Sequence, residues 1–158
     1  MRPRKFQRHF VNKKGFTVVE MMVAMGIFAI MTAIAVPSYL STQPGLRLNG
    51  AAREVLGKLM WARAKAVELN TTYTVTFPTS STFQIFNDAN GNGSADAGEW
   101  NQTIDIQTDY PGITFSKSGS DPIFNGRGTA SGSTTITVSN GGSTRTVTVS
   151  ATGNVRVS

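Results

Sequence analysis

The stretch KKGFTVVEMM, residues 13–22, joins a basic head to a long apolar run. Residues 16–36 read FTVVEMMVAMGIFAIMTAIAV, and Glu20 is the single charged residue among them. A helix of this length rises about 31 Å, which matches the hydrocarbon thickness of a bilayer. The sequence therefore predicts a membrane-spanning helix that carries a carboxylate near its beginning.

The positive charge of the chain lies almost entirely before this helix. The net charge is +6, and six Lys and Arg residues precede Gly15 without any acid, whereas basic and acidic residues balance from Phe16 onward. The excess of cations before the apolar run predicts a cytoplasmic N-terminus and a C-terminal part on the other side of the membrane. It also argues against a generally anion-binding domain.

Glu20 needs a partner, because a carboxylate deep in a bilayer costs about 2.5–3.5 kcal/mol. It could reach water at the membrane interface, or lie in the first turn of a helix, whose positive end favours an acid. A cut after Gly15 would offer a third partner. Phe16 would then carry a new α-amine four residues before Glu20, on the same helical face. The two charges could pair within one chain or between neighbours.

The segment KKGFTVVE, residues 13–20, closely resembles the cleavage and N-methylation motif of type IV prepilins and pseudopilins. The resemblance implies cleavage between Gly15 and Phe16 by prepilin peptidase and methylation of the Phe16 amine. It further implies assembly with other pilin or pseudopilin subunits on an inner-membrane platform, into an extracytoplasmic filament. Pro37 matches the proline at which pilin helices loosen during assembly. Phe16, Glu20 and Pro37 are therefore the candidate assembly residues.

A conventional secretory signal is the alternative for the N-terminus. The residues Ala33, Ile34 and Ala35 form a small-x-small site, and cleavage there would release a soluble β-protein that begins at Val36. The apolar run is longer than the 7–15 residues typical of such signals, and it contains Glu20, so the prepilin interpretation is favoured.

An amphipathic helix and a set of strands follow the apolar run. In residues 41–70, apolar side chains recur at steps of three and four residues and predict one buried face: Leu48, Ala52, Val55, Leu59, Ala62, Ala66 and Leu69. Beyond Asn70 the composition shifts to Thr, Val, Ser and Gly. Strands are predicted at 71–77, 82–86, 103–108, 112–116, 134–139 and 144–150, with a hairpin turn at 140–142.

The predicted fold class is α+β, with a long N-terminal helix packed on an antiparallel β-sheet domain as in type IV pilins. The expected segments are a basic leader at 1–15, a transmembrane and filament-core helix at 16–40, an amphipathic helix at 41–70 and a periplasmic β-rich domain at 71–158. No internal repeat is apparent.

The part after the anchor resembles the GspH/FimT group, the H-type minor pseudopilins of type II secretion and related minor pilins of type IV pili. The segments FNGRG at 124–128 and GNVR at 153–156 carry this resemblance most clearly. It implies a structural subunit that helps to initiate or cap a filament, and it leaves the secretion and pilus systems open.

Some FimT-like proteins bind DNA through a C-terminal Gly-Arg-x-Arg motif, which makes DNA uptake an alternative function. Here Asn154 replaces the first arginine of that motif. Arg145 and Arg156 are the candidate nucleic-acid residues, but acids outnumber Lys and Arg from Thr71 to the end of the chain. Because DNA affinity depends on cations matched to phosphates, this charge balance argues against DNA as a partner.

The loop DANGNGSADAGE, residues 88–99, has the spacing of a calcium-binding loop. Oxygen-bearing side chains alternate around Gly93, and a final glutamate could bind the ion with both oxygens: Asp88, Asn90, Asn92, Ser94, Asp96 and Glu99. The predicted flanks are strands and not the helices of an EF-hand. The same residue types are also common in plain turns. Calcium is therefore a possible ligand, and no cofactor is required.

The composition argues against an enzyme. The chain has no cysteine and a single histidine, His9, which disfavours zinc sites and nucleophilic triads. The acids Asp105, Asp109 and Asp121 show no spacing that would place two of them across a cleft, and no phosphate-binding loop is present. No catalytic residue is predicted.

Overall fold

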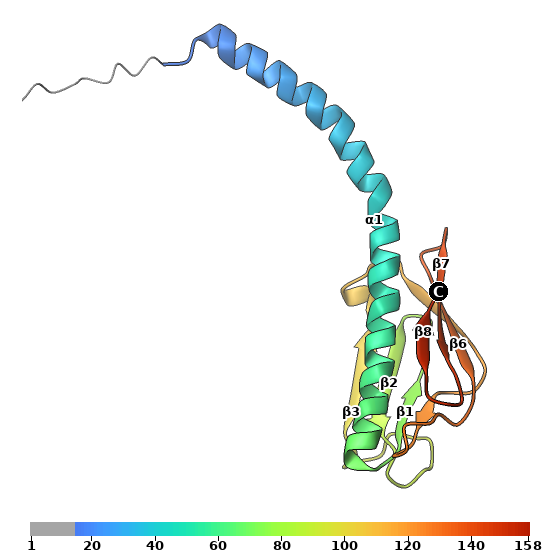
Figure 1. Ribbon diagram of the computed structural model, residues 1–158. Coiled ribbons are helices and arrows are strands. Elements are labelled where there is room, and N and C mark those ends of the chain that lie inside the picture. The colour runs from blue at the N-terminus through green and yellow to red at the C-terminus, as the bar shows by residue number, and fades with distance from the viewer. Residues whose placement is uncertain (1–14) are drawn as a thin grey trace, which may run out of the picture. The chain divides into compact units, whose positions relative to one another are not determined.

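The computed structural model describes residues 15–158 and contains one long helix and eight strands in this part of the chain. The helix, α1, spans Val18–Leu69 (Figure 1). The chain divides into two units between Ser41 and Thr42, so α1 contributes to both. The predicted leader lies outside the described residues, apart from Gly15.

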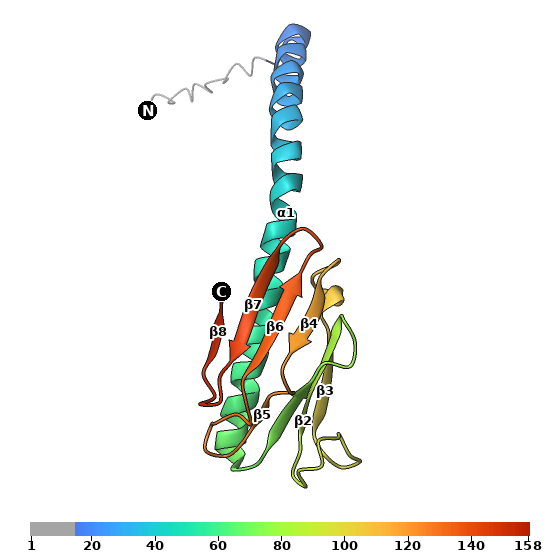
Figure 2. The same cartoon turned by 90° about the vertical axis from the view of Figure 1, so that its right-hand side faces the viewer.

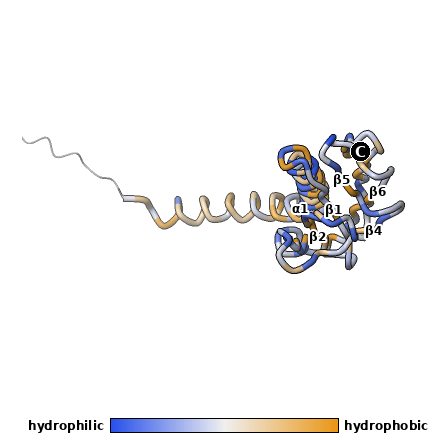
Figure 3. Tube along the Cα trace, turned by 90° about the horizontal axis from the view of Figure 1, so that it is seen from below, coloured by the Kyte–Doolittle hydropathy of each residue, from blue (hydrophilic) through white to orange (hydrophobic). Residues whose placement is uncertain are grey.

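The first part of α1 presents apolar side chains on all sides. Phe28 is 69% exposed and Ile34 is 71% exposed, and the hydropathy colouring of Figure 3 follows the apolar character of this segment. By length and composition alone, α1 contains a window of 18 residues that could cross a membrane, and none of that window is buried within the chain. A helix that is apolar all round is suited to lipid or to a filament core.

The helix continues through Pro37 and Pro44, so the predicted apolar segment 16–40 and the amphipathic segment 41–70 form one long helix, as expected. Proline has no N–H, so each one removes a backbone hydrogen bond from the helix interior. At the other end, α1 ends at Leu69, and the next residue, Asn70, adopts a left-handed conformation with φ 47°. Thr71 N–H donates to Ala66 and Asn70 N–H donates to Val67, which satisfies the last carbonyls in a Schellman motif.

One face of the second part of α1 is buried under the strands, and most of its residues are those predicted. The buried side chains on the helix are Leu48, Ala51, Ala52, Val55, Leu59, Ala62 and Ala66. The prediction was wrong for Leu69, which is 53% exposed because the chain leaves the core at the end of the helix. Four of the seven buried residues are alanines, so the strands can approach the helix axis closely.

Eight strands form two antiparallel four-stranded sheets in the described part of the chain, where one sheet was expected from the sequence. The first sheet has the order β3-β2-β1-β5 and the second has the order β4-β6-β7-β8. Their bounds are β1 Tyr73–Thr76, β2 Thr82–Asn87, β3 Asn101–Asp105, β4 Thr114–Ser118, β5 Ile123–Phe124, β6 Thr134–Ser139, β7 Thr144–Val149 and β8 Val155–Val157. Both sheets lie along the second part of α1 (Figure 2).

The six predicted strands are observed, with one correction and two additions. The strand predicted at 103–108 ends at Asp105, whose carboxylate accepts a hydrogen bond from Gln107 N–H and caps a short 3-10 helix, Ile106–Thr108. The strands β5 and β8 were missed, because segments of two and three residues carry no readable alternation. The α+β class and the packing of a long N-terminal helix on antiparallel strands are confirmed.

Gly128 of the segment FNGRG and Gly153 of the segment GNVR lie where two loops contact the second part of α1. Arg63 Nε donates to the carbonyl of Gly128 at 2.8 Å. Gly153 lies against the same carbonyl, and a Cβ at Gly153 would collide with it. Gly153 also has φ +78°, which disfavours other residues. The close approach of three segments therefore explains both glycines.

Replacing Gly153 with alanine should destabilise the second unit by about 2–4 kcal/mol, through the left-handed backbone and the collision together. The matched control is Gly141→Ala, since Gly141 has φ +84° but no atom within 4 Å of the place where a Cβ would stand. The control should cost about 1–2 kcal/mol. Chemical unfolding monitored by tryptophan fluorescence measures both, and equal losses would contradict the close approach.

Candidate assembly and processing site

Thr17 and Glu20, three residues apart, cap the beginning of α1. Thr17 N–H and Thr17 Oγ1 donate to Glu20 Oε2 at 2.8 and 2.9 Å, and Glu20 N–H donates to Thr17 Oγ1 at 3.2 Å. This reciprocal arrangement is a capping box, with Thr17 at the N-cap and Glu20 at the third helical position. In the uncleaved chain, Glu20 is therefore already satisfied by its own helix.

The first-turn position of Glu20 was among the alternatives drawn from the sequence, but Thr17 was missed as its partner. The sequence does indicate this contact, because Thr-x-x-Glu immediately before an apolar run is the pattern of a capping box. Phe16 precedes Thr17 directly, and its side chain is 85% exposed. Gly15 has no described atom within 4 Å of the position where a Cβ would stand, so both residues that flank the predicted cut are open.

The acidic loop joins β2 to β3 and is folded around its own side chains. Asp96 Oδ2 accepts hydrogen bonds from the amide groups of Asn90 and Asn92, at 2.7 and 2.6 Å. Glu99 Oε1 accepts from Ala89 N–H and Glu99 Oε2 accepts from Asp96 N–H, both at 3.1 Å. The loop thus brings together most of the candidate calcium ligands, whereas Ser94 contributes its N–H to Asn92 Oδ1.

Asp88 occupies a different environment from the rest of the loop. It is 2% exposed, and its Oδ2 accepts from Thr74 Oγ1 at 3.1 Å and from Gly93 N–H at 3.0 Å. Asp88 Oδ1 is buried without a hydrogen-bond partner among residues 15–158. An unsatisfied buried oxygen of this kind costs about 1–3 kcal/mol, and more where the group is charged.

The three acids of the loop do not form a ready carboxylate cluster. Within the described residues, no three His, Cys, Asp or Glu side chains lie together in a group that could hold a metal ion. Coordination of calcium at this loop would therefore also depend on amide and backbone oxygens. The calcium site stays a prediction at this point.

An aromatic cluster lies at the end of the acidic loop. The ring centroids of Trp61 and Trp100 are 4.9 Å apart, and Tyr73 lies 6.0 Å from Trp61 and 6.1 Å from Trp100. Trp61 is half-buried against the core, and Trp100 remains 43% exposed. The cluster therefore connects α1, β1 and the residue that follows Glu99.

The two candidate nucleic-acid residues lie on opposite faces of the second sheet. Arg145 lies two residues before the buried Val147 along β7 and therefore on the same face, and its Nε donates to Asn49 Oδ1 at 2.8 Å. Arg156 pairs with Thr148, which points to the other face. The fold therefore does not bring Arg145 and Arg156 into one phosphate-binding surface.

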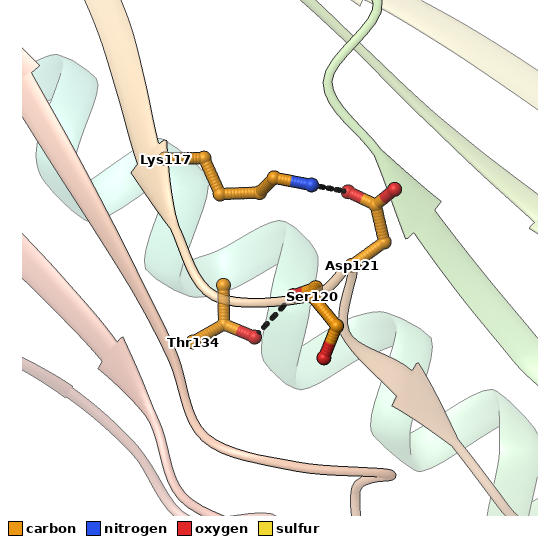
Figure 4. Close-up of polar contacts among 4 residues, drawn as sticks. All are labelled: Lys117, Ser120, Asp121 and Thr134. Atoms are coloured by element: carbon orange, nitrogen blue, oxygen red, sulfur yellow. Dashed lines mark hydrogen bonds and ion pairs between the residues drawn. The ribbon is translucent and has the colours of Figure 1, made fainter.

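Asp121, one of the acids weighed as catalytic from the sequence, has a structural partner. Lys117 at the end of β4 forms an ion pair with Asp121, and Thr134 Oγ1 donates to the Ser120 carbonyl at 2.6 Å (Figure 4). These contacts fix the connection by which the chain passes from β4 in the second sheet to β5 in the first. Arg127 lies in a turn, where its N–H donates to Asn125 Oδ1 at 3.0 Å.

A shallow groove of about 600 Å³ runs beside the exposed face of α1 in the second unit. Its lining is mostly apolar and includes Met60, Val67 and the Arg127-Gly128 turn. At its rim, Glu68 accepts a hydrogen bond from Lys65 at 2.8 Å and raises the pKa of Lys65. The groove holds no arrangement of nucleophile, base and oxyanion donors among the residues that line it.

Comparison with known families matches the two parts of the chain separately. Residues 11–36 match the prokaryotic N-terminal methylation motif. Residues 51–153 match the type II transport protein GspH. The chain belongs to the GspH family. It is therefore an H-type pseudopilin and a structural protein, and not an enzyme.

Solved structures show the same fold at low sequence identity. The type IV minor pilin FimU of Pseudomonas aeruginosa is similar with a TM-score of 0.58 and 19% identity, over 70% of this chain and 87% of FimU. The minor pseudopilin EpsH of the Vibrio cholerae type 2 secretion system is similar with a TM-score of 0.54 and 10% identity, over 71% of this chain and 96% of EpsH. No curated protein sequence matches the chain.

The methylation motif and the apolar part of α1 are together consistent with a prepilin anchored in the inner membrane. Association with other pilins and with prepilin peptidase follows at the level of the family.

Thr17→Ala should loosen the first turn of α1, because it removes the hydroxyl that bonds Glu20 in both directions. Loss of an N-cap costs about 1 kcal/mol, which corresponds to about fivefold faster amide exchange in that turn. Hydrogen–deuterium exchange of the full chain in detergent micelles measures this rate. Thr17→Ser keeps the hydroxyl and should exchange like the wild type; equal protection in the alanine variant would contradict the capping role.

Proposed function

We propose that this chain is a minor subunit of a type II secretion pseudopilus that helps to initiate or cap the filament. The GspH match over residues 51–153, joined in one chain to the methylation motif, carries the proposal. The GspH match favours the secretion system over a type IV pilus, whereas the likeness to FimU concerns the fold alone. No observation on the described residues favours DNA uptake, since Arg145 and Arg156 face opposite sides.

The proposed life cycle begins with insertion as a single-pass protein of the inner membrane. The N-terminus is cytoplasmic, the apolar part of α1 spans the bilayer, and the β-rich domain lies in the periplasm. Prepilin peptidase cuts between Gly15 and Phe16 and methylates the new Phe16 amine. The anchor then leaves the bilayer at the assembly platform and joins the core of the extracytoplasmic filament, with Pro37 as a point where the helix can loosen.

Glu20 has two roles in this scheme, one before and one after the cut. Before cleavage, the capping box with Thr17 stabilises the carboxylate within its own helix. After cleavage, the Phe16 amine is a cation close to the same carboxylate. A charge pair of this kind can align a subunit with its neighbour, because a mismatched register would leave one charge unpaired in an apolar core.

Mass spectrometry of the protein isolated from membranes should show a mature chain that begins at Phe16 and carries one N-terminal methyl group. A Gly15→Ala change should leave the uncut precursor, because Gly15 is the residue of the methylation motif directly before the predicted cut. The chain itself tolerates the change, since no described atom lies near a Cβ there. Gly26→Ala, equally open in α1, is the matched control and should be processed normally.

A mature chain that begins at Val36 would instead support a conventional secretory signal. A chain cut at any other bond would contradict both interpretations.

Glu20→Ala should leave membrane insertion and cleavage intact but lower incorporation into filaments by more than about tenfold. The reason is that removing one member of a buried charge pair costs about 3–5 kcal/mol. The measurement is the amount of variant in sheared filaments from a strain that lacks the wild-type gene, together with secretion and pilus-dependent motility in that strain. Glu68→Ala removes an exposed acid of α1 and serves as the control.

Equal incorporation of the Glu20 and Glu68 variants would reject the alignment role. Lost motility with intact secretion would assign the subunit to a pilus.

A further inference from the structure

The buried carboxylate of Asp88 indicates a ligand for the loop of residues 88–99. Among the described residues, Asp88 Oδ1 is the buried side-chain oxygen that lacks a hydrogen-bond partner. Its other oxygen, Oδ2, accepts from Gly93 N–H of the loop at 3.0 Å and from Thr74 Oγ1 of β1 at 3.1 Å, so the carboxylate lies where the loop meets the first sheet. A buried anionic oxygen with no donor is stabilised by a cation.

The rest of the loop supplies further oxygens in the order that a calcium ion requires. Counted from Asp88 as position one, positions three, five, nine and twelve carry side-chain oxygens: Asn90, Asn92, Asp96 and Glu99. Position six is Gly93, with φ +77°, which permits the sharp turn. Position seven is Ser94, which offers its backbone carbonyl in this register.

Hydrogen bonds already connect several side chains of the loop to one another and to its backbone. Asp96 Oδ2 lies within 2.7 Å of the Asn90 amide and 2.6 Å of the Asn92 amide. Glu99 reaches back across the loop to the N–H of Ala89, next to Asp88. The backbone hydrogen bond from Asn87 to Trp100 holds the two ends of the loop together. Binding of an ion would then require side-chain rotations that turn these oxygens toward a common centre.

We propose that residues 88–99 bind one calcium ion, with Asp88 Oδ1 as the buried ligand. Three carboxylates and no Lys or Arg lie within the loop, which suits a hard dication. Calcium is favoured over magnesium because it accepts six to eight oxygens in a flexible geometry, whereas magnesium demands a near-ideal octahedron and retains water.

The bound ion would join the ends of β2 and β3 through the loop. Asp88 follows β2, and Glu99 precedes Trp100, which packs on Trp61 of α1. The proposal predicts an affinity in the range of extracellular calcium modules, about 10⁻⁴ to 10⁻³ M. It is independent of the assembly role, since it concerns neither Phe16 nor Glu20.

Calcium binding is tested on the full chain in detergent after treatment with a chelator. Addition of about 10 mM calcium should raise the melting temperature of the second unit by about 5 °C. Terbium should show luminescence sensitised by Trp100, and calcium should displace it. The same concentration of magnesium should produce a much smaller shift. Absence of a calcium shift in the wild type would overturn the proposal.

Three variants connect the response to the loop. Glu99→Gln and Asp96→Asn should weaken calcium binding by about tenfold or more, since each removes a charged ligand. Asp88→Asn should also weaken calcium binding by about tenfold or more. If this change at a buried residue prevents folding, Glu99→Gln and Asp96→Asn still test the site. Asp109→Asn removes an exposed acid outside the loop and should respond like the wild type. An unchanged response in Glu99→Gln and Asp96→Asn would place the ion elsewhere and reject the site.

Discussion

The packing of one face of α1 against the strands is the constraint on which the β-rich domain depends. Alanines supply four of the seven buried residues on the helix, and Ala51, Ala62 and Ala66 have no exposed surface. Larger side chains at these positions would force the sheets outward, because a packed core has no spare volume. Small residues also matter at Arg63, where a Cβ at Gly153 would collide with the Gly128 carbonyl and Gly128 has a left-handed backbone with φ +77°. The core and the two glycine-containing loops thus both depend on small residues where they contact α1.

The capping box at the start of α1 resolves the conflict between an apolar anchor and its carboxylate. Thr17 supplies two donors to Glu20, so the carboxylate of the precursor is not isolated at this point of the helix. In the proposed life cycle, proteolysis then adds a cation beside a carboxylate that the helix has already positioned. In this proposal, local hydrogen bonding and later charge pairing use the same side chain in succession.

The connections between strands show why the β-rich domain forms two sheets. Lys117, Ser120 and Asp121 hold the passage from β4 to β5 in place, and this passage transfers the chain from one sheet to the other. The hairpin from β2 to β3 contains the acidic loop, whose side chains bond to one another and to the backbone. Both connections are polar, yet each is specified by a small number of defined contacts.

The sequence by itself determined the apolar anchor, the buried face of the amphipathic helix and six strands, because hydrophobic periodicity and Thr/Val-rich alternation are local properties. It also determined the residues of the processing motif and of the acidic loop. Only the tertiary structure decided that the strands divide into two sheets, that Arg145 and Arg156 face opposite sides, and that Asp88 is buried with an unpaired oxygen among the described residues. These features depend on contacts between residues far apart in the chain, and no local pattern records which distant partner a strand or a side chain will meet.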